Sequence, residues 1–307
     1  MTAHEYREIE VPVDGGLLRA GVWEPVSPAQ GTPTVLLVHG ITSSHLAWSH
    51  VVRSLPGVRV IAPDLRGRGR SNAVEGAAGM AAHADDLAAL LDATGIDRTV
   101  VVGHSMGGFV SLVFAHRHPE RVSRVLLVDG GLPLDVPEGL DTDTMVAGIL
   151  GPTAKRLSMR FADLGEYLDF WRVHPAFGDA WSEDLERYFA YDLVDDGEGA
   201  YRPATSYQTT ADDTVDMNTG SALPDALAGI AHPVRLITVP RGLQNEPPGL
   251  YAPEHLERML AAFPSIRHER VDEGLNHYTI VISEAGAAVV APAILDEIAH
   301  AAAVATA

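Results

Sequence analysis

Residues 103–107, Gly-His-Ser-Met-Gly, have the residue types and the spacing that suit a nucleophilic serine. They follow the apolar, β-branched run 99–102 and precede a helix-like segment, 108–118. A sharp turn from a strand into a helix exposes the serine Oγ at the helix N-terminus, and the flanking glycines provide the clearance that this strained turn needs. We therefore predict that Ser105 is a nucleophile.

The sequence lacks the residues that several other catalytic chemistries need. The chain has no cysteine, which excludes thiolate nucleophiles and cysteine-bound metals. His116 and His118 would face apart on a helix, so they are not expected to bind a metal. The glycines among Arg66, Arg68 and Arg70 match neither G-x-G-x-x-G nor a Walker A loop, and we interpret this stretch as a loop that closes against the edge of a sheet. We expect no metal and no cofactor.

Strand and helix patterns alternate in the N-terminal part of the chain. This alternation favours right-handed crossovers and a mainly parallel sheet. A Asp-Gly-Gly hairpin signal at 14–16 joins the first two strands. The predicted strands are 6–13, 17–23, 34–39, 58–62, 99–102 and 125–128, and a predicted helix covers 80–94.

The alternation breaks after Asp129. Residues 133–231 have a helical pattern with many aromatic residues. The sheet pattern then resumes with strands at 234–239 and 266–271, a helix at 253–262 between them, and a terminal helix from about Glu284. We therefore expect one core, residues 1–132 and 232–307, with a helical insertion at 133–231.

Composition limits the partners. The formal charge of −19 opposes binding to nucleic acid or to an anionic membrane surface. No unbroken apolar run approaches the ~20 residues of a membrane span, and the first ten residues are polar and acidic. We expect a soluble, cytoplasmic protein that acts on a small molecule; the oligomeric state stays open.

This layout resembles the α/β-hydrolase superfamily over nearly the whole chain. The supporting motifs are His39-Gly40 after the third strand, residues 64–71 (DLRGRGRS) after the fourth, the elbow, residues 118–122 (HPERV), and a late His277. The resemblance implies a mainly parallel eight-stranded sheet with helices on both faces and a helical cap after the sixth strand. Serine at the elbow argues against haloalkane dehalogenase and epoxide hydrolase chemistry, which uses aspartate there.

The resemblance also implies roles around the serine. Family order makes His277 the general base. The acid usually follows the seventh strand, where Glu246 is the only carboxylate in the loop, so Glu246 is preferred and Asp129, after the sixth strand, is the alternative. The backbone N–H groups of Ile41 and Met106 are expected to form the oxyanion hole.

Three further expectations concern the surroundings of the site. His39 should make hydrogen bonds behind the oxyanion loop, and His104 should point away from the site. Aromatic residues at helical spacing are more often core than pocket, but a minority are expected to line a pocket. The candidates are Trp48, Phe170, Trp171 and Trp181.

We expect a hydrolase that cleaves a carboxylic ester of a small or medium apolar substrate. Lactone, amide and carbon–carbon bond hydrolysis on the same residues remain alternatives. From a different class, a non-catalytic ligand-binding protein would also retain such a pocket.

Overall fold

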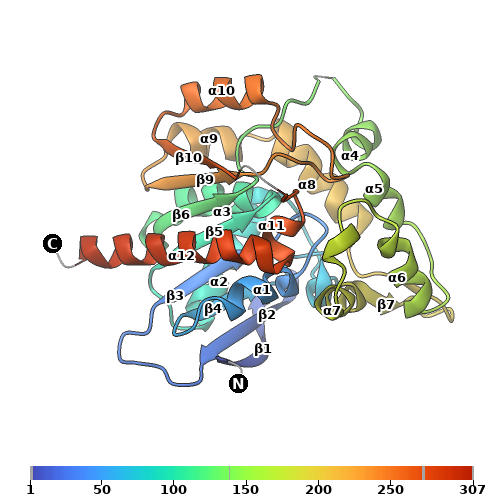
Figure 1. The fold of residues 1–307 in the computed structure, drawn as a ribbon, viewed down its shortest axis with the longest axis horizontal. Coiled ribbons are helices and arrows are strands. Elements are labelled where there is room, and N and C mark those ends of the chain that lie inside the picture. The colour runs from blue at the N-terminus through green and yellow to red at the C-terminus, as the bar shows by residue number, and fades with distance from the viewer. Residues whose placement is uncertain (1–2, 138, 272–273, 306–307) are drawn as a thin grey trace.

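The computed structural model describes residues 3–137, 139–271 and 274–305, and it is built around one eight-stranded sheet (Figure 1). The strand order is β1-β2-β4-β3-β5-β6-β9-β10. β1 pairs antiparallel with β2, β2 pairs antiparallel with β4, and the other neighbours are parallel. The strands are β1 (His4–Val13), β2 (Gly16–Pro25), β3 (Thr34–Val38), β4 (Arg59–Pro63), β5 (Thr99–His104), β6 (Val122–Val128), β9 (Val234–Thr238) and β10 (Ile266–Arg270). The predicted sheet is confirmed.

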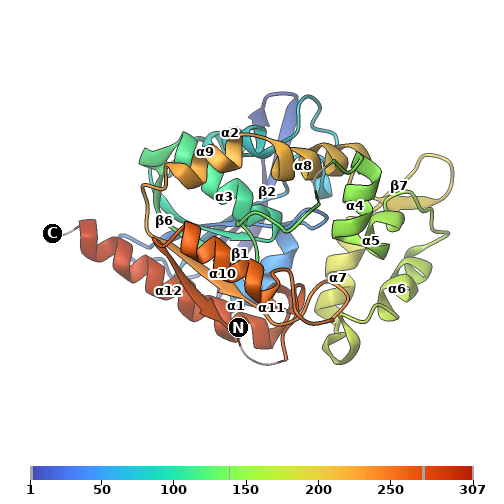
Figure 2. The ribbon, with the colours of Figure 1, turned by 90° about the horizontal axis from the view of Figure 1, so that it is seen from above.

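Both faces of the sheet are covered by helices, which is why the central strands are apolar throughout. All six residues of β5 are buried. Side chains alternate between the faces: Val101 packs on one side, whereas Val100 and Val102 pack on the other. The helices α2 (Met80–Ala93), α3 (Met106–Arg117), α9 (Ala222–Ala228) and α10 (Pro253–Ala262) contribute to the first core, and α1 (Ser49–Arg53), α11 (Thr279–Ile282) and α12 (Glu284–Ala305) to the second (Figure 2).

The terminal helix α12 is long and apolar enough to cross a membrane by length and composition alone, with a mean hydropathy of 1.6 in an 18-residue window. A search for unbroken apolar runs misses this helix because acidic residues and a histidine interrupt it. In the fold, α12 packs against β5, β6 and α1, and Val290 and Ile294 are fully buried. These contacts are those of a helix that covers a sheet.

The insertion between β6 and β9 is mostly helical, as its pattern predicts, and lies at one end of the sheet (right in Figure 1). Its helices are α4 (Thr142–Leu150), α5 (Pro152–Arg156), α6 (Leu164–Arg172), α7 (Glu183–Asp192) and α8 (Tyr207–Thr219). Four of them begin at a side-chain N-cap that accepts a backbone N–H, which explains their start points. These caps are Asp141, Asp163, Ser182 and Ser206.

Two features of the insertion depart from the expectation. A short hairpin joins β7 (Leu193–Asp195) to β8 (Tyr201–Pro203), with Gly197 and Gly199 at positive φ in its turn. In addition, α9 packs against α3 and belongs to the helical layer of the core. The part that stands off the sheet is therefore shorter than 133–231.

Candidate active site

Ser105 lies at the turn between β5 and α3, with φ 54° and ψ −126°. Such a conformation is costly for a residue with a side chain and needs tight surroundings to hold it. Gly103 and Gly107 make those surroundings fit: a Cβ at Gly103 would lie 2.1 Å from the carbonyl oxygen of Gly107, and one at Gly107 would lie 2.1 Å from that of Val38. The strand–turn–helix geometry predicted around Ser105 is present.

His277 follows β10 and approaches Ser105 from the other side of the turn. Its Nε2 lies 3.0 Å from Ser105 Oγ. The backbone holds the residue at both ends, since its N–H donates to the carbonyl of Arg241 at 2.9 Å and its own carbonyl accepts from His104 Nε2 at 2.8 Å. The imidazole is therefore in position to accept the proton of the serine hydroxyl.

Asp129 is the carboxylate that contacts this imidazole. It directly follows β6, its φ is 45°, and its Oδ2 accepts a hydrogen bond from His277 Nδ1 at 2.6 Å. The backbone N–H of Val239 lies 3.3 Å from its Oδ1, and its own N–H donates to the carbonyl of Ile237 at 2.7 Å. The side chain is buried. An anion so placed fixes which imidazole nitrogen carries the proton and which faces the serine.

The structure corrects the preference for Glu246 as the acid. Glu246 is exposed, and its carboxylate makes no hydrogen bond or ion pair with any residue in the described part of the chain. The loop after β9 folds back on itself, with the N–H of Gly242 donating to the carbonyl of Glu246 at 2.7 Å. This turn leaves the glutamate at the rim of a surface groove, whereas the side chain of Asp129 leaves the sheet beside the end of β5.

The loop after β3 provides the second wall of the site. β3 pairs with β5, so Gly40 lies beside the nucleophile: a Cβ on Gly40 would be 3.1 Å from Ser105 Cβ. Neither the N–H of Ile41 nor that of Met106 has a hydrogen-bond acceptor among the residues that the structure describes. Both residues line the cavity at Ser105, as expected for oxyanion donors.

Arg68 braces this loop, a role that the sequence did not indicate. Its guanidinium is fully buried, donates through Nε to the carbonyl of Ile41 at 2.7 Å, and lies 3.9 Å from the sulfur of Met106. Asp213 of α8 balances the charge at 2.5 Å. The loop 64–71 thus closes against the sheet, as predicted, and also connects the oxyanion residues with the insertion.

Two buried histidines flank the site. His39 makes the expected hydrogen bonds behind the loop: its Nδ1 donates to the carbonyl of Gly40 at 2.7 Å, and its Nε2 accepts from the N–H of Leu65 at 2.9 Å. Burial lowers the pKa of His39 to about 4. His104 does not point away; it lines the cavity, and its ring lies 4.8 Å from that of His277 between centroids. Burial also lowers the pKa of His104, followed in size by the charge of His277, so His104 stays neutral at pH 7.

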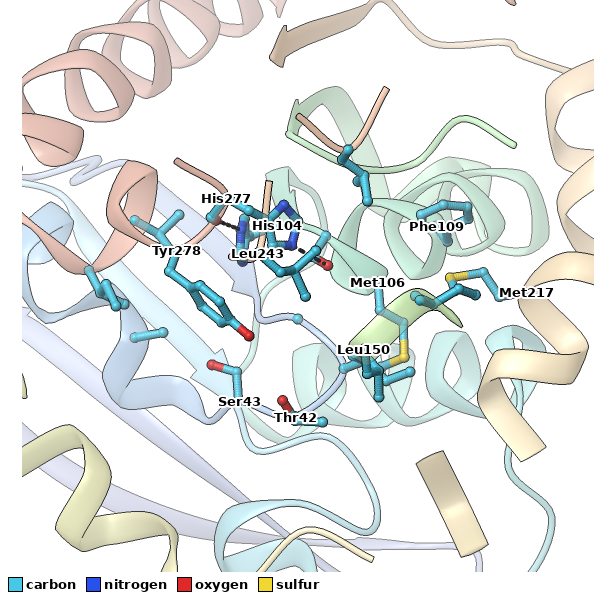
Figure 3. Close-up of a pocket in the computed structure, with 18 of the residues that line it drawn as sticks. Thr42, Ser43, His104, Met106, Phe109, Leu150, Met217, Leu243, His277 and Tyr278 are labelled. Atoms are coloured by element: carbon cyan, nitrogen blue, oxygen red, sulfur yellow. Dashed lines mark hydrogen bonds between the residues drawn. The ribbon is translucent and has the colours of Figure 1, made fainter. Parts of the chain in front are cut away.

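The cavity above Ser105 has two chemically different ends (Figure 3). Tyr278 points its hydroxyl toward Ser43 at one end, where the hydroxyl of Tyr188 also donates to Ser43 at 2.8 Å. Apolar side chains form the other end, and they come from the core, the insertion and the loop after β9. They are Met106, Phe109, Leu134, Ile149, Leu150, Met217, Leu243 and Leu250.

None of the four predicted pocket aromatics lines this cavity. Trp48 is fully buried with its ring edge-on to His104, and Phe170 packs within the aromatic cluster of the insertion. Trp171 lines a smaller recess beyond Tyr188 and Tyr278, and Trp181 a separate surface cleft. The correction agrees with the general expectation that most aromatic residues at helical spacing form core. Tyr188 of the insertion does line the cavity, together with Phe109, Tyr278 and aliphatic residues from several elements.

Comparisons with known proteins agree with this architecture. A family model described as the alpha/beta hydrolase fold matches residues 33–223. The chain is 39% identical over 105 residues to lipase LipV of Mycobacterium tuberculosis, and 39% identical over 117 residues to 2-hydroxy-6-oxo-2,4-heptadienoate hydrolase of Pseudomonas putida. These matches cover 34% and 36% of this chain and 40% and 42% of the relatives.

Two solved structures share the fold over almost their full length. The thioesterase domain from the curacin biosynthetic pathway superposes with a TM-score of 0.72 at 21% identity, over 95% of this chain and 99% of that one. E-2-(acetamidomethylene)succinate hydrolase superposes with a TM-score of 0.73 at 21% identity, over 96% and 99%. With the sheet order, the serine elbow and the family match in agreement, the chain belongs to the alpha/beta hydrolase fold family.

Proposed function

We propose that this chain is a serine hydrolase that cleaves a carboxylic ester of a small to medium apolar substrate through an acyl-enzyme on Ser105. The observation that carries the proposal is the continuous chain of hydrogen-bonding distances from Ser105 Oγ to His277 Nε2, 3.0 Å, and from His277 Nδ1 to Asp129 Oδ2, 2.6 Å. The Ser105 end of this hydrogen-bond series lies at the floor of a largely apolar cavity.

Acylation begins when Ser105 Oγ attacks the ester carbonyl carbon and its proton passes to His277 Nε2. The carboxylate of Asp129 stabilises the imidazolium that forms, because it already accepts the Nδ1 proton. The negative charge on the former carbonyl oxygen falls between the N–H groups of Ile41 and Met106, and such donors typically contribute about 3 kcal/mol each. His277 then protonates the leaving alcohol, and the carbon–oxygen bond breaks.

Deacylation repeats these steps with water as the nucleophile. His277 Nε2 takes a proton from water, the resulting hydroxide attacks the acyl carbon, and the proton returns to Ser105 Oγ as the acid leaves. His104 remains neutral beside His277, so it adds no second positive charge against the imidazolium. Its hydrogen bond to the His277 carbonyl keeps the imidazole in place during both half-reactions.

The lining of the cavity supports an apolar substrate. Aliphatic and thioether side chains from three parts of the chain surround the reactive serine, and burial of a substrate methylene in such a lining contributes about 0.8 kcal/mol. The two relatives are named as a lipase and as a 2-hydroxy-6-oxo-2,4-heptadienoate hydrolase, and both names describe hydrolases. Ester cleavage needs no group beyond those found here.

Hydrolysis of p-nitrophenyl esters from acetate to decanoate tests the proposal. We expect turnover by the wild-type chain and a loss of at least about 10³-fold in kcat for Ser105→Ala, because the general base and the oxyanion donors have no nucleophile to act on. A fluorophosphonate should label the wild-type chain once, on the peptide that contains Ser105. Turnover that survives in Ser105→Ala would reject the assignment of the nucleophile.

Absence of ester turnover separates the remaining candidates. A Ser105 adduct without ester turnover would direct the search to lactones, amides or carbon–carbon bonds, since these use the same nucleophile and base. Absence of both the adduct and turnover would favour a ligand-binding protein.

A further inference from the structure

A second hollow lies next to the catalytic cavity and opens to solvent. This groove runs between the first helix of the insertion, α4, and the loop after β9. It shares four lining residues with the cavity at Ser105, namely Leu134, Ile149, Leu243 and Leu250. The two hollows therefore lie side by side, and these four apolar side chains form the wall that they share.

Apolar side chains form the larger part of the groove lining. Beyond the four shared residues, its lining includes Val136, Leu140 and Met145, together with Gly148 on the same helix as Met145. Each methylene of an alkyl chain that moves from water into such a lining raises the binding constant by up to about fourfold. Among the residues that the structure describes, the lining contains no lysine or arginine that would pair with an anionic group.

Two acidic residues lie at the rim of the groove, and neighbouring positive groups balance their charges to different degrees. Asp135 lies 3.6 Å from Arg258 and 3.9 Å from His255, so its charge is partly balanced. Glu246 is exposed and makes no ion pair within the described residues, and the nearby Arg241 donates to the carbonyl of Asn245 instead. The mouth of the groove therefore favours a neutral chain over one that ends in a carboxylate.

We propose that this groove binds the extended, uncharged alkyl chain of the acyl group whose carbonyl reacts at Ser105. The inference rests on the proposed function and specifies its substrate class: esters of medium to long unbranched acids without a terminal charge. The carbonyl lies at Ser105, the first methylenes fill the apolar end of the cavity, and the remaining chain passes Leu243 and Leu250 into the groove.

Gly148 offers a direct way to close the groove. It lies within α4, and a Cβ built on it meets no atom within 4 Å, so a phenylalanine side chain would start in open space without a clash. Phenylalanine is also a better helix former than glycine, so Gly148→Phe should fold. Ala147 is exposed on the same helix and does not line the groove, which makes Ala147→Phe the matched control.

The kinetic test compares kcat/KM for p-nitrophenyl decanoate and acetate in these variants. We expect the ratio of decanoate to acetate to fall at least tenfold in Gly148→Phe and to stay within twofold of wild type in Ala147→Phe. An unchanged ratio in Gly148→Phe, an equal fall in both variants, or a fall seen with decyl acetate rather than with decanoate would overturn the proposal.

A binding measurement separates this proposal from the proposed reaction. Calorimetric titration of N-methyldecanamide, which carries its alkyl chain on the acyl side, into Ser105→Ala needs no turnover, and we expect the Kd to rise at least tenfold when Gly148→Phe is added but not when Ala147→Phe is added. If this pattern holds while the wild-type chain cleaves no ester, the groove stands and the reaction is wrong. If the decanoyl group of this amide binds equally with and without Gly148→Phe, the groove assignment is wrong whatever reaction the protein catalyses.

Discussion

The carboxyl ends of β6 and β9 are neighbours in the sheet, and a candidate acid follows each of them. Asp129 comes directly after β6, is buried, and contacts His277. Glu246 comes eight residues after Thr238, the last residue of β9, and reaches the surface. A residue that directly follows a strand inherits its position from the sheet, whereas a residue deep in a loop takes its position from the path of that loop.

The two regions also differ in how much the protein restrains them. The backbone of Asp129 is held at φ 45° by its hydrogen bond to Ile237, and its carboxylate by His277 and Val239. The loop around Glu246 and the groove beside it are open to solvent. We infer that the catalytic groups lie where several contacts hold each side chain, and that substrate selection depends on the open walls of the groove, which can vary.

The strongest test of this comparison replaces each of the two carboxylates by an amide in a separate variant. Asp129→Asn should lower kcat for p-nitrophenyl butyrate by about 10³-fold or more, because an amide favours the wrong imidazole tautomer and cannot stabilise the imidazolium. Glu246→Gln should lower it by less than about threefold. Circular dichroism spectra and thermal unfolding of both variants serve as the control for folding. A large loss in Glu246→Gln with a mild one in Asp129→Asn would return the acid to the loop after β9.

Acid should lower the free energy of unfolding through a buried histidine behind the site, His39. The pKa of His39 is lowered by burial from 6.5 to about 4, so the unfolded chain binds a proton that the folded chain refuses between these values. The free energy of unfolding is therefore highest above pH 6.5 and falls as the pH drops toward 4, by up to about 3 kcal/mol from this residue. Urea unfolding at pH 7, 6 and 5 measures the slope.

His39→Gln is the variant that isolates this contribution. It removes the titrating group, so its free energy of unfolding should depend less on pH than that of the wild type, even where the variant is less stable at pH 7. Equal stability of the wild-type chain at pH 7 and pH 5 would contradict the prediction.

The smallest expected effect concerns the charge at the groove mouth. Glu246→Gln should raise kcat/KM for the p-nitrophenyl monoester of decanedioic acid by about two- to fivefold at low ionic strength, because it removes an exposed negative charge near the free carboxylate. The gain should vanish near 1 M salt, and neutral decanoate should not show it. Asp135→Asn, whose charge Arg258 already balances, should have less effect. A gain that persists at high salt would mean that the effect is not electrostatic.

Much of the fold followed from local pattern. The strands at the centre of the sheet are short apolar runs bounded by turn signals, and the helix boundary at Ala262 and the strand start at Val234 agree with the observed ones. Local pattern failed where a choice depends on distant residues. The hairpin of β7 and β8 lies inside a helical insertion, and α9 is assigned to the core only by its packing on α3.

The site divides in the same way. Ser105 was identifiable because its turn constrains its surroundings: only small residues fit at 103 and 107, and a strand and a helix must flank them. His277 followed from the order of the chain. The bracing role of Arg68 and the position of His104 were missed because their partners, Ile41 and Asp213 for the first and the carbonyl of His277 for the second, are remote in sequence.

The sequence by itself therefore indicated the strands of the sheet and the elbow at Ser105, because backbone sterics and hydrophobic periodicity act over a few residues, whereas His277 was predicted from the chain order of the family. Tertiary structure alone decided between Asp129 and Glu246, and it selected the aliphatic residues that line the cavity instead of the predicted tryptophans. These choices depend on which strand ends become neighbours and how a loop turns back. Contacts across 148 residues, such as that between Asp129 and His277, leave no mark in the local pattern.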